Sequence, residues 1–227
     1  MSASGSGPVV HVVAAAVIDA AGRVLIAQRP SGKHMAGGWE FPGGKLEPGE
    51  ERVTGLAREL REELGISIIG TPRPLIRVRH AYPSREVLLD IWVVKRYSGE
   101  ARGLDGQALR WCTQDELEAA ELLPADRPIV RALRLPERLM RVVSRDYSIG
   151  DAVAINDAGL HGVFCTNADE AAAAARTGAD FLAMRRALGL DELAGLCGLV
   201  PVAVFARGIE LEDAWASGAS GLNEIID

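Results

Sequence analysis

The chain has 227 residues, which is enough for one large domain or two small ones. Hydrophobic residues make up 48% and charged residues 25%, values of ordinary globular proteins that exclude disordered and collagen-like classes. The net charge of −6 is uneven: residues 1–135 carry 18 Lys+Arg against 17 Asp+Glu, and residues 136–227 carry 7 against 14. Because neither part shows a basic stripe for a phosphate backbone, we expect no nucleic-acid polymer as a partner.

The sequence also argues against a membrane or secreted location. The longest apolar run, over residues 8–18, is interrupted by His11 and is about half the ~20 residues that a membrane span needs. It lacks the basic flank of a signal peptide. The three cysteines (Cys112, Cys165 and Cys197) have no metal-ligand spacing and are expected to be reduced and buried. We therefore expect a cytoplasmic protein with no membrane partner.

The first part of the chain has an α+β pattern with mixed strand directions. Runs rich in β-branched residues predict strands, in chain order, over residues 9–18, 23–28, 75–80, 87–95 and 109–112. The turn over residues 19–22 is expected to join the first two strands as a hairpin. A loop rich in glycine and proline over residues 32–49 leads into a helix over 51–64. A last helix is expected after Asp126, a good N-cap, with Pro128 in its first turn.

The helix predicted over residues 51–64 has an apolar stripe and an acidic face. Five positions at helical spacing form the stripe that we expect to be buried: Val53, Leu56, Ala57, Leu60 and Leu64. Glu59, Glu62 and Glu63 share a neighbouring face. Three like charges repel one another unless a cation neutralises them, and carboxylate oxygens suit Mg²⁺. The plainer alternative is a solvated acidic face of a helix.

The sequence around this helix carries a long motif with fixed spacing. Gly44 is followed by Glu50, and then by the run from Arg58 to Ile66 that holds the three glutamates. This pattern resembles a complete Nudix box, with no departure at its defining positions. The resemblance implies hydrolysis of a nucleoside diphosphate linked to another moiety, with Mg²⁺ or Mn²⁺ as cofactor. It also implies an α/β fold, an α/β/α sandwich around a mixed sheet.

The resemblance implies roles for the residues of the box. The catalytic set is Glu50, Arg58, Glu59, Glu62 and Glu63, with Glu59 as the candidate that takes a proton from water. The metal set is Gly43, Glu59, Glu62 and Glu63, in which the Gly43 carbonyl completes the shell. Gly43 and Gly44 allow close approach of the backbone to a ligand.

Over residues 9–135 the likeness extends to the MutT-type branch of the family, which hydrolyses 8-oxo-dGTP to 8-oxo-dGMP and diphosphate. The pocket residues that it implies are Arg29, His34, Glu40, Phe41, Pro42, Gly43, Arg85 and Asp126. Arg29 and His34 would contact phosphate or sugar, whereas Arg85 and Asp126 would face the base. Plainer roles stay open: a salt bridge for Arg29, a surface loop for His34, a solvated turn for Arg85 and core packing for Phe41. The alternative substrates are ADP-ribose, a dinucleotide or a thiamine-pathway pyrophosphate. A protein that keeps the fold without turnover is a further alternative, which the intact box disfavours.

Two positions depart from the MutT-type pattern. Asp126 stands where asparagine is expected, and a carboxylate only accepts hydrogen bonds whereas an amide also donates them. Asp126 is therefore either a contact to guanine N1–H and N2–H₂ or a helix cap. Asp105 stands where a further metal-associated glutamate is expected, so the fourth carboxylate is either Asp105 or Glu100.

The composition changes near residue 135, and we expect a domain boundary there, between residues 1–135 and 136–227. The second part repeats an alanine-rich helix, a glycine cap and a short strand at an offset of 40 residues, with strands expected over 162–165, 181–184, 200–206 and 222–226. This alternation predicts a parallel sheet. Residues 160–227 resemble the C-terminal half of thiamine phosphate synthase, which implies a partial βα-barrel. Because the front half of that barrel has no room here, we expect a module without catalysis that docks or forms a homodimer.

Overall fold

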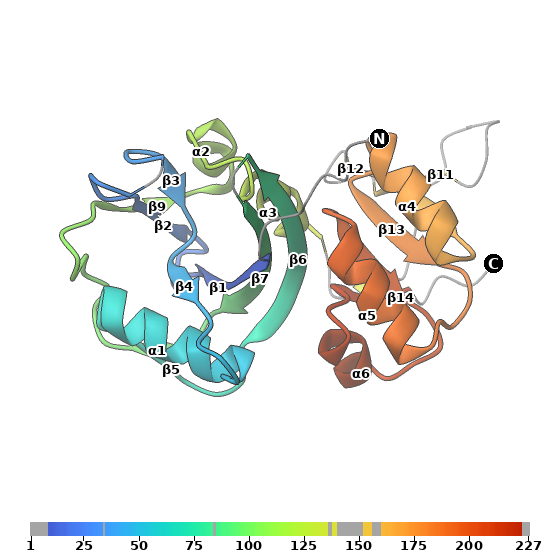
Figure 1. Cartoon of the computed structure of the whole chain (residues 1–227), viewed down its shortest axis with the longest axis horizontal. Helices are drawn as coiled ribbons and strands as arrows, with labels where there is room; N and C mark the ends of the chain where they lie inside the picture. The colour runs from blue at the N-terminus through green and yellow to red at the C-terminus, as the bar shows by residue number, and fades with distance from the viewer. Residues whose placement is uncertain are drawn as a thin grey trace. The chain divides into compact units, whose positions relative to one another are not determined.

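The computed structural model describes residues 9–33, 35–83, 85–135, 138–139, 152–155 and 160–223 (Figure 1). The chain divides into two compact units. The first unit comprises residues 1–73 and 80–130, and the second comprises residues 74–79 and 131–227. Each unit has its own hydrophobic core, and each is described separately below.

A four-stranded mixed sheet contains three strands of the first unit and β6, whose residues 74–79 are grouped with the second unit. Its order is β4-β1-β7-β6, with the strands spanning Gly43–Lys45, Val9–Val17, Arg85–Val94 and Arg73–Tyr82. β1 runs parallel to β7, with Val13 opposite Asp90, and antiparallel to β4, with Ala14 opposite Gly43. The mixed sheet expected from the sequence is thus confirmed, and β4 lies at its edge beside the most buried strand pair.

Two smaller sheets complete the strands of this unit. One has the order β3-β2-β9, with the strands spanning Trp39–Glu40, Val24–Gln28 and Leu109–Cys112; the other pairs β5 with β8, spanning Ser67–Ile68 and Tyr97–Ser98. The expected hairpin between the first two strands is wrong. A turn held by the Asp19 carboxylate is present, but β1 and β2 share one isolated bridge, Ile18 to Val24, and then enter different sheets.

Helix α1 (Arg52–Leu64) packs against β1 and β4. Leu56, Leu60 and Leu64 are fully buried and meet the apolar side chains of β1 in one core. Val53, expected in the same stripe, is 37% exposed, since the first turn of the helix extends past the core. Gly65 ends the helix in a left-handed conformation (φ 69°), which glycine adopts without steric cost.

Two short helices follow β9 in the first part of the chain. α2 (Gln114–Ala119) begins with a capping box, in which the side chains of Thr113 and Glu116 each accept a hydrogen bond from the other residue's backbone N–H. α3 (Arg127–Ala132) begins directly after Asp126, as expected. None of the described helices is both long and apolar enough to cross a bilayer.

The second unit contains a six-stranded sheet in the order β10-β15-β14-β13-β12-β11. The strands span, in that order, Arg138–Leu139, Gly221–Asn223, Ala203–Ala206, Phe181–Met184, Leu160–Cys165 and Ala152–Ile155. The four strands β12 to β15 are mutually parallel in sequence order, as predicted, whereas β11 is antiparallel to β12. The end of the last expected strand, beyond residue 223, lies outside the described residues.

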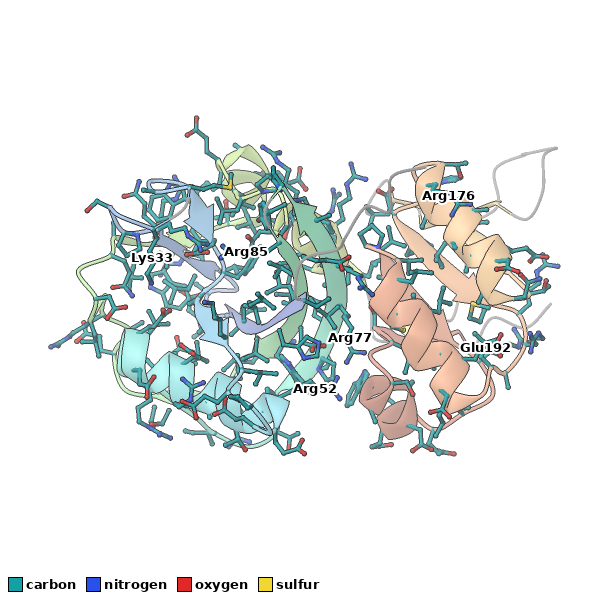
Figure 2. All side chains as sticks on the ribbon, viewed as in Figure 1. Lys33, Arg52, Arg77, Arg85, Arg176 and Glu192 are labelled. Carbon is teal, nitrogen blue, oxygen red and sulfur yellow. The ribbon has the colours of Figure 1, made fainter. Side chains whose placement is uncertain are left out.

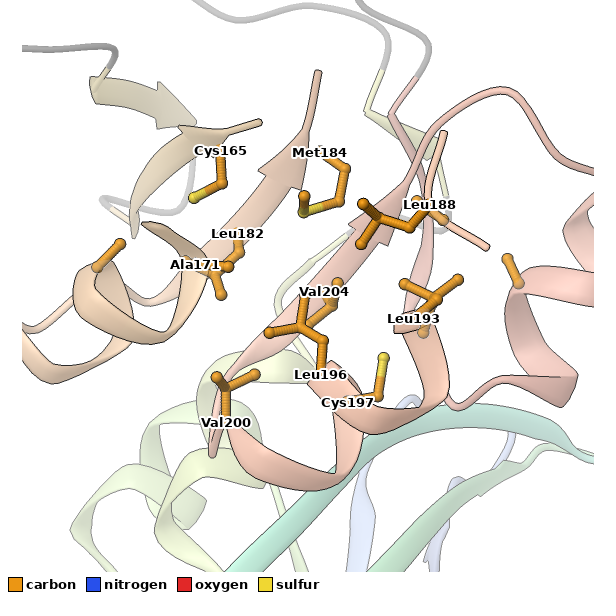
Figure 3. Close-up of a cluster of buried hydrophobic side chains, with 14 of the residues drawn as sticks. Cys165, Ala171, Leu182, Met184, Leu188, Leu193, Leu196, Cys197, Val200 and Val204 are labelled. Atoms are coloured by element: carbon orange, nitrogen blue, oxygen red, sulfur yellow. The ribbon is translucent and has the colours of Figure 1, made fainter. Parts of the chain in front are cut away.

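Three helices connect the parallel strands of the second unit: α4 (Ala168–Arg176), α5 (Leu190–Leu199) and α6 (Leu211–Ala216). Their apolar faces meet the sheet in one core, in which Leu182, Leu193 and Val204 are buried (Figure 3). Cys165 and Cys197 are buried in this core as reduced thiols, which agrees with the expectation from the sequence. The unit is a series of strand–helix–strand crossovers of the kind that builds parallel sheets.

Candidate active site

A cavity of about 540 Å³ lies in the first unit between the start of β7, the loop after β2 and one face of α1. Positively charged, negatively charged and apolar side chains all line it. Among the lining residues are Val12, Arg29, Lys33, Glu40, Phe41, Gly43, Gly44, Glu59, Glu63, Tyr82, Arg85 and Asp126. Figure 2 shows two of them, Lys33 on the loop between β2 and β3 and Arg85 at the start of β7. The cavity is large enough for a nucleotide-sized ligand.

Two glycines on β4 bring the backbone close to the glutamates of α1. At Gly43 the backbone has φ 151°, and a Cβ there would overlap the carbonyl oxygen of Val13 on β1. A Cβ on Gly44 would overlap the carboxyl group of Glu59. Glycine is therefore required at position 43, where a Cβ would meet backbone, whereas at position 44 a Cβ would displace the Glu59 carboxylate, which lies directly against the β4 backbone.

Arg58 holds three carboxylates on one side of α1. Its Nε and Nη2 donate to the two oxygens of Glu50, both at 2.9 Å, and its Nη1 donates to Glu59 at 2.8 Å and to Glu62 at 3.2 Å. Nη2 also donates to the carbonyl oxygen of Lys45 on β4. The bidentate pair with Arg58 lowers the pKa of Glu50 to about 2, so Glu50 stays ionised. Arg58 thereby holds these carboxylates close to β4.

Glu63 lies in surroundings that oppose its charge. Burial, with smaller contributions from the carboxylates of Glu59, Glu40 and Asp105, raises the pKa of its carboxyl to about 7, against the opposing effect of the Lys33 charge. The Glu63 backbone is fixed, because its carbonyl oxygen accepts from the Gln107 side chain at 3.1 Å and from the Leu104 N–H at 2.9 Å. A cation bound here would remove the repulsion and hold Glu63 in its ionised form.

Some of the carboxylates predicted as metal ligands line the cavity, and their oxygens are suitable ligands for a hard divalent cation. Glu59 and Glu63 line the cavity beside Gly43, and Mg²⁺ takes a few carboxylate oxygens and keeps several waters. Glu62 does not line it; its side chain is 60% exposed and is held by Arg58. In the described part of the chain, no three carboxylate, histidine or cysteine side chains already form a metal cluster. The carboxylates thus supply two of the expected ligands, and the substrate phosphates have room to supply others.

Asp126 also lines the cavity. Its carboxyl is fully buried, and Oδ1 accepts a hydrogen bond from the Phe41 N–H at 3.3 Å. Burial, with a contribution from the nearby Glu40 carboxylate, raises the pKa of Asp126 to about 8. Tyr82 and Arg85 line the same cavity, and the Asp126 charge acts on Tyr82. The arrangement holds a buried carboxyl by the backbone, beside other polar side chains of the cavity, which suits recognition of a base edge.

Comparison with known proteins identifies the family. The family model of the NUDIX domain matches residues 13–132, which is more than half of the chain. The chain belongs to the Nudix family. It is a Nudix hydrolase, an enzyme that acts on phosphoric anhydrides, as the resemblance of the box implied.

The relatives that match this Nudix domain have related activities. The chain is similar to the CTP pyrophosphohydrolase of Escherichia coli K12, with 41% identity over 120 residues that cover 53% of this chain and 88% of the relative. It is 36% identical to the 8-oxo-dGTP diphosphatase of the same organism over 114 residues, 49% of this chain and 85% of the relative. The crystal structure of a MutT Nudix hydrolase from Burkholderia pseudomallei matches with a TM-score of 0.51 and 27% identity, covering 56% of this chain and 98% of that one. Each match covers the Nudix half of the chain.

Most of the residues expected in the Nudix site come together around the cavity, although their roles stay predictions. Arg29 forms a salt bridge with Glu40, so the plainer role considered for Arg29 is present at the cavity wall. Phe41 is buried and lines the cavity as well. Pro42 lines only a small adjoining cavity. His34 lies outside the described residues.

The structure distinguishes the two candidates for the fourth carboxylate, Asp105 and Glu100. Asp105 lines the small adjoining cavity together with Glu40 and Glu63. Glu100 is 77% exposed and pairs with Arg102, and it lines neither cavity. The geometry therefore favours Asp105.

Sequence reasoning missed two residues of the site. Lys33 lines both cavities, and Gln107 lines the small one and holds the Glu63 carbonyl. A signal for Lys33 was present, because the chain has three lysines and two of them, Lys33 and Lys45, lie within residues 32–49, just before α1. No local pattern marks Gln107, which reaches Glu63 from 44 residues along the chain.

Proposed function

We propose that this Nudix hydrolase is a Mg²⁺-dependent nucleoside triphosphate pyrophosphohydrolase that converts 8-oxo-dGTP and water to 8-oxo-dGMP and diphosphate. Such an enzyme removes an oxidised nucleotide from the pool used for DNA replication, which implies a cytoplasmic location. One observation carries the proposal: the Glu59 and Glu63 carboxylates and the buried Asp126 line a single cavity. Relatives that are 8-oxo-dGTP diphosphatases support the substrate.

The chemistry assigned to the carboxylates is attack of water on the β-phosphorus. Mg²⁺, when bound, neutralises charge that develops on the phosphates. Glu59 and Glu63 are proposed to hold it with the Gly43 carbonyl, and Glu62 would join them only by turning from Arg58 toward the cavity. Glu59 is the proposed base, because its carboxylate lies against Gly44 at the cavity wall. The bond between the β-phosphorus and the oxygen that bridges to the α-phosphorus breaks. The nucleoside monophosphate leaves with that bridging oxygen, and the oxygen of the water becomes part of diphosphate.

Arg58 and Glu50 have a positioning role in this proposal. Arg58 binds Glu50 with two hydrogen bonds and Glu59 with one, so Glu50 fixes the guanidinium and the guanidinium fixes Glu59. A carboxylate held in one orientation presents its free oxygen to water or to a metal without paying for ordering during the reaction. Neither residue needs to exchange a proton.

Asp126 is the proposed base contact. Its Oδ1 is occupied by the Phe41 N–H, so the other oxygen is left for the ligand. With a pKa raised to about 8, Asp126 is largely protonated at neutral pH and can donate a hydrogen bond as well as accept one. A neutral carboxyl therefore reproduces the donor and acceptor pattern of the asparagine expected at this position.

A second candidate substrate is CTP. It is favoured by the similarity to a CTP pyrophosphohydrolase and by the acceptor oxygen of Asp126, which suits the amino group of cytosine. The reaction and the carboxylates would be the same for both substrates, and only the contacts at the base end would differ.

For the second unit we propose a partial βα-barrel of the thiamine phosphate synthase type, without catalysis, that docks or forms a homodimer. The sequential parallel strands β12 to β15, joined by helices, support this architecture. An open parallel sheet has edges that another surface must cover.

The proposed reaction is tested by product analysis. The full-length protein is incubated with 8-oxo-dGTP and Mg²⁺ in water labelled with ¹⁸O, and in parallel with a chelator. We expect one diphosphate for each 8-oxo-dGMP, the label in diphosphate, and no turnover with the chelator. Release of inorganic phosphate in place of diphosphate, or turnover without metal, would contradict the proposal.

A further inference from the structure

Lys33 stands where two cavities of the Nudix unit meet. It lines the large cavity, and it also lines a small cavity of about 10 Å³, room for about one water molecule, together with Glu40, Glu63 and Asp105. Its side chain is exposed, on the loop between β2 and β3, where the Lys33 N–H donates to the Pro30 carbonyl in a turn (Figure 2). The ammonium group thus projects from the rim of the site.

The two arginines near this end of the cavity are already paired with carboxylates. Arg29 forms its salt bridge with Glu40, and Arg58 is shared among Glu50, Glu59 and Glu62. The Lys33 side chain, by contrast, makes no hydrogen bond or close ion pair with any residue in the described ranges. Its positive charge is therefore available to a ligand.

Without a ligand, Lys33 compensates the carboxylates across the small cavity. Its charge lowers the pKa of both Glu40 and Glu63, although burial raises both overall. A divalent cation on Glu63 would take over this compensation and repel the ammonium. A triphosphate in the large cavity would then offer the ammonium a new partner, because ammonium groups bind phosphate oxygens as point charges.

We propose that Lys33 is a substrate-binding residue, whose ammonium contacts the terminal phosphates of the substrate, the part released as diphosphate. This inference rests on the proposed pyrophosphohydrolase function of the same site. Lys33 stays protonated, and no bond forms or breaks at it. Removing its charge therefore has two opposite effects: weaker binding of phosphate and tighter binding of a metal ion in the absence of nucleotide.

Calorimetry on full-length variants tests both effects. For Lys33→Met we expect the Kd of inorganic diphosphate and the KM of the triphosphate to rise about tenfold, and the Kd of Mn²⁺ without nucleotide to fall. Lys33→Arg keeps the charge and should restore both. Lys95→Met is the matched control, since it removes the same charge outside both cavities and should leave all three constants unchanged.

The outcomes separate this inference from the function on which it rests. A Lys33→Met variant whose diphosphate affinity stays within twofold of wild type overturns the inference, as does an equal loss in Lys95→Met. A melting curve checks folding, and Lys33→Gln serves as a second variant if Lys33→Met is unstable. If the wild type hydrolyses no nucleoside triphosphate, the proposed function fails, while diphosphate and Mn²⁺ binding still report on Lys33.

Discussion

At the residue scale, Glu63 is a carboxylate whose charge burial and the neighbouring carboxylates oppose. Glu63→Gln keeps the shape of the side chain and removes the charge that a metal requires, so we expect kcat to fall by about 10²-fold or more. Melting of the metal-free protein should be unchanged or slightly higher, because repulsion from Glu59 is relieved. Steady-state kinetics at saturating Mg²⁺ measure the effect. Glu100→Gln, at an exposed carboxylate, is the control, and an unchanged kcat in Glu63→Gln would exclude Glu63 from the site.

Asp126 is expected to set the choice of base rather than the rate of the chemical step. Asp126→Asn changes one hydrogen-bonding group at a base edge, which is worth about 1–3 kcal/mol in discrimination. We therefore expect the ratio of kcat/KM for 8-oxo-dGTP to that for dGTP to change, with the metal dependence unaltered. A constant ratio together with a lower melting temperature would show that Asp126 only supports the Phe41 backbone and α3.

The raised pKa of Asp126 also predicts how stability depends on pH. Its carboxyl has a pKa of about 8 in the folded chain against an ordinary value of 3.8, so the folded state binds the proton more tightly. Its contribution to the free energy of unfolding is full below about pH 4 and is lost as pH rises toward 8. The melting temperature of the wild type relative to Asp126→Asn should therefore fall between pH 5 and 8. A difference that stays constant or grows with pH would contradict the buried, protonated carboxyl.

At the scale of elements, the site depends on how closely β4 approaches α1. Gly44→Ala places a methyl group where the Glu59 carboxylate lies, so the carboxylate must move away from the strand. We expect kcat to fall by about tenfold or more with a small change in melting temperature, measured by kinetics and calorimetry on the same samples. Gly198→Ala, at a helical position of α5 with open space around it, is the control and should keep full turnover. Normal kcat in Gly44→Ala would contradict the proposed position of Glu59.

The sequence predicted elements whose signals are local and missed pairings that are not. The helix expected over residues 51–64 spans Arg52–Leu64, because its leucine spacing and the terminal Gly65 are read directly from neighbours along the chain. The prediction that β1 and β2 form a hairpin was wrong, because β1 pairs along its whole length with β7, about 75 residues away in the sequence. The box glutamates were predictable from fixed spacing on one helix. The position of Glu62 was not, because it depends on which carboxylates Arg58 binds.

At the scale of the whole molecule, the groups assigned to the reaction lie in the first unit and before residue 135. A truncated chain of residues 1–135 should keep kcat within about threefold, or about 0.7 kcal/mol. It should differ in oligomeric state, solubility or melting temperature, since an open parallel sheet needs another surface over its edges. Kinetics and light scattering on the truncated and full-length chains test this. Loss of turnover in a folded truncated chain would mean that the second unit contributes to the site.

The central claim is that the cavity between the α1 carboxylates and Asp126 selects a nucleoside triphosphate. The most direct measurement is kcat/KM of the full-length protein, with Mg²⁺, for 8-oxo-dGTP, dGTP, CTP, ADP-ribose, a dinucleotide and a thiamine-pathway pyrophosphate. We predict the highest value for 8-oxo-dGTP, about tenfold or more above dGTP, with diphosphate as a product. A higher value for ADP-ribose, the dinucleotide or the thiamine-pathway pyrophosphate than for every triphosphate would contradict the claim.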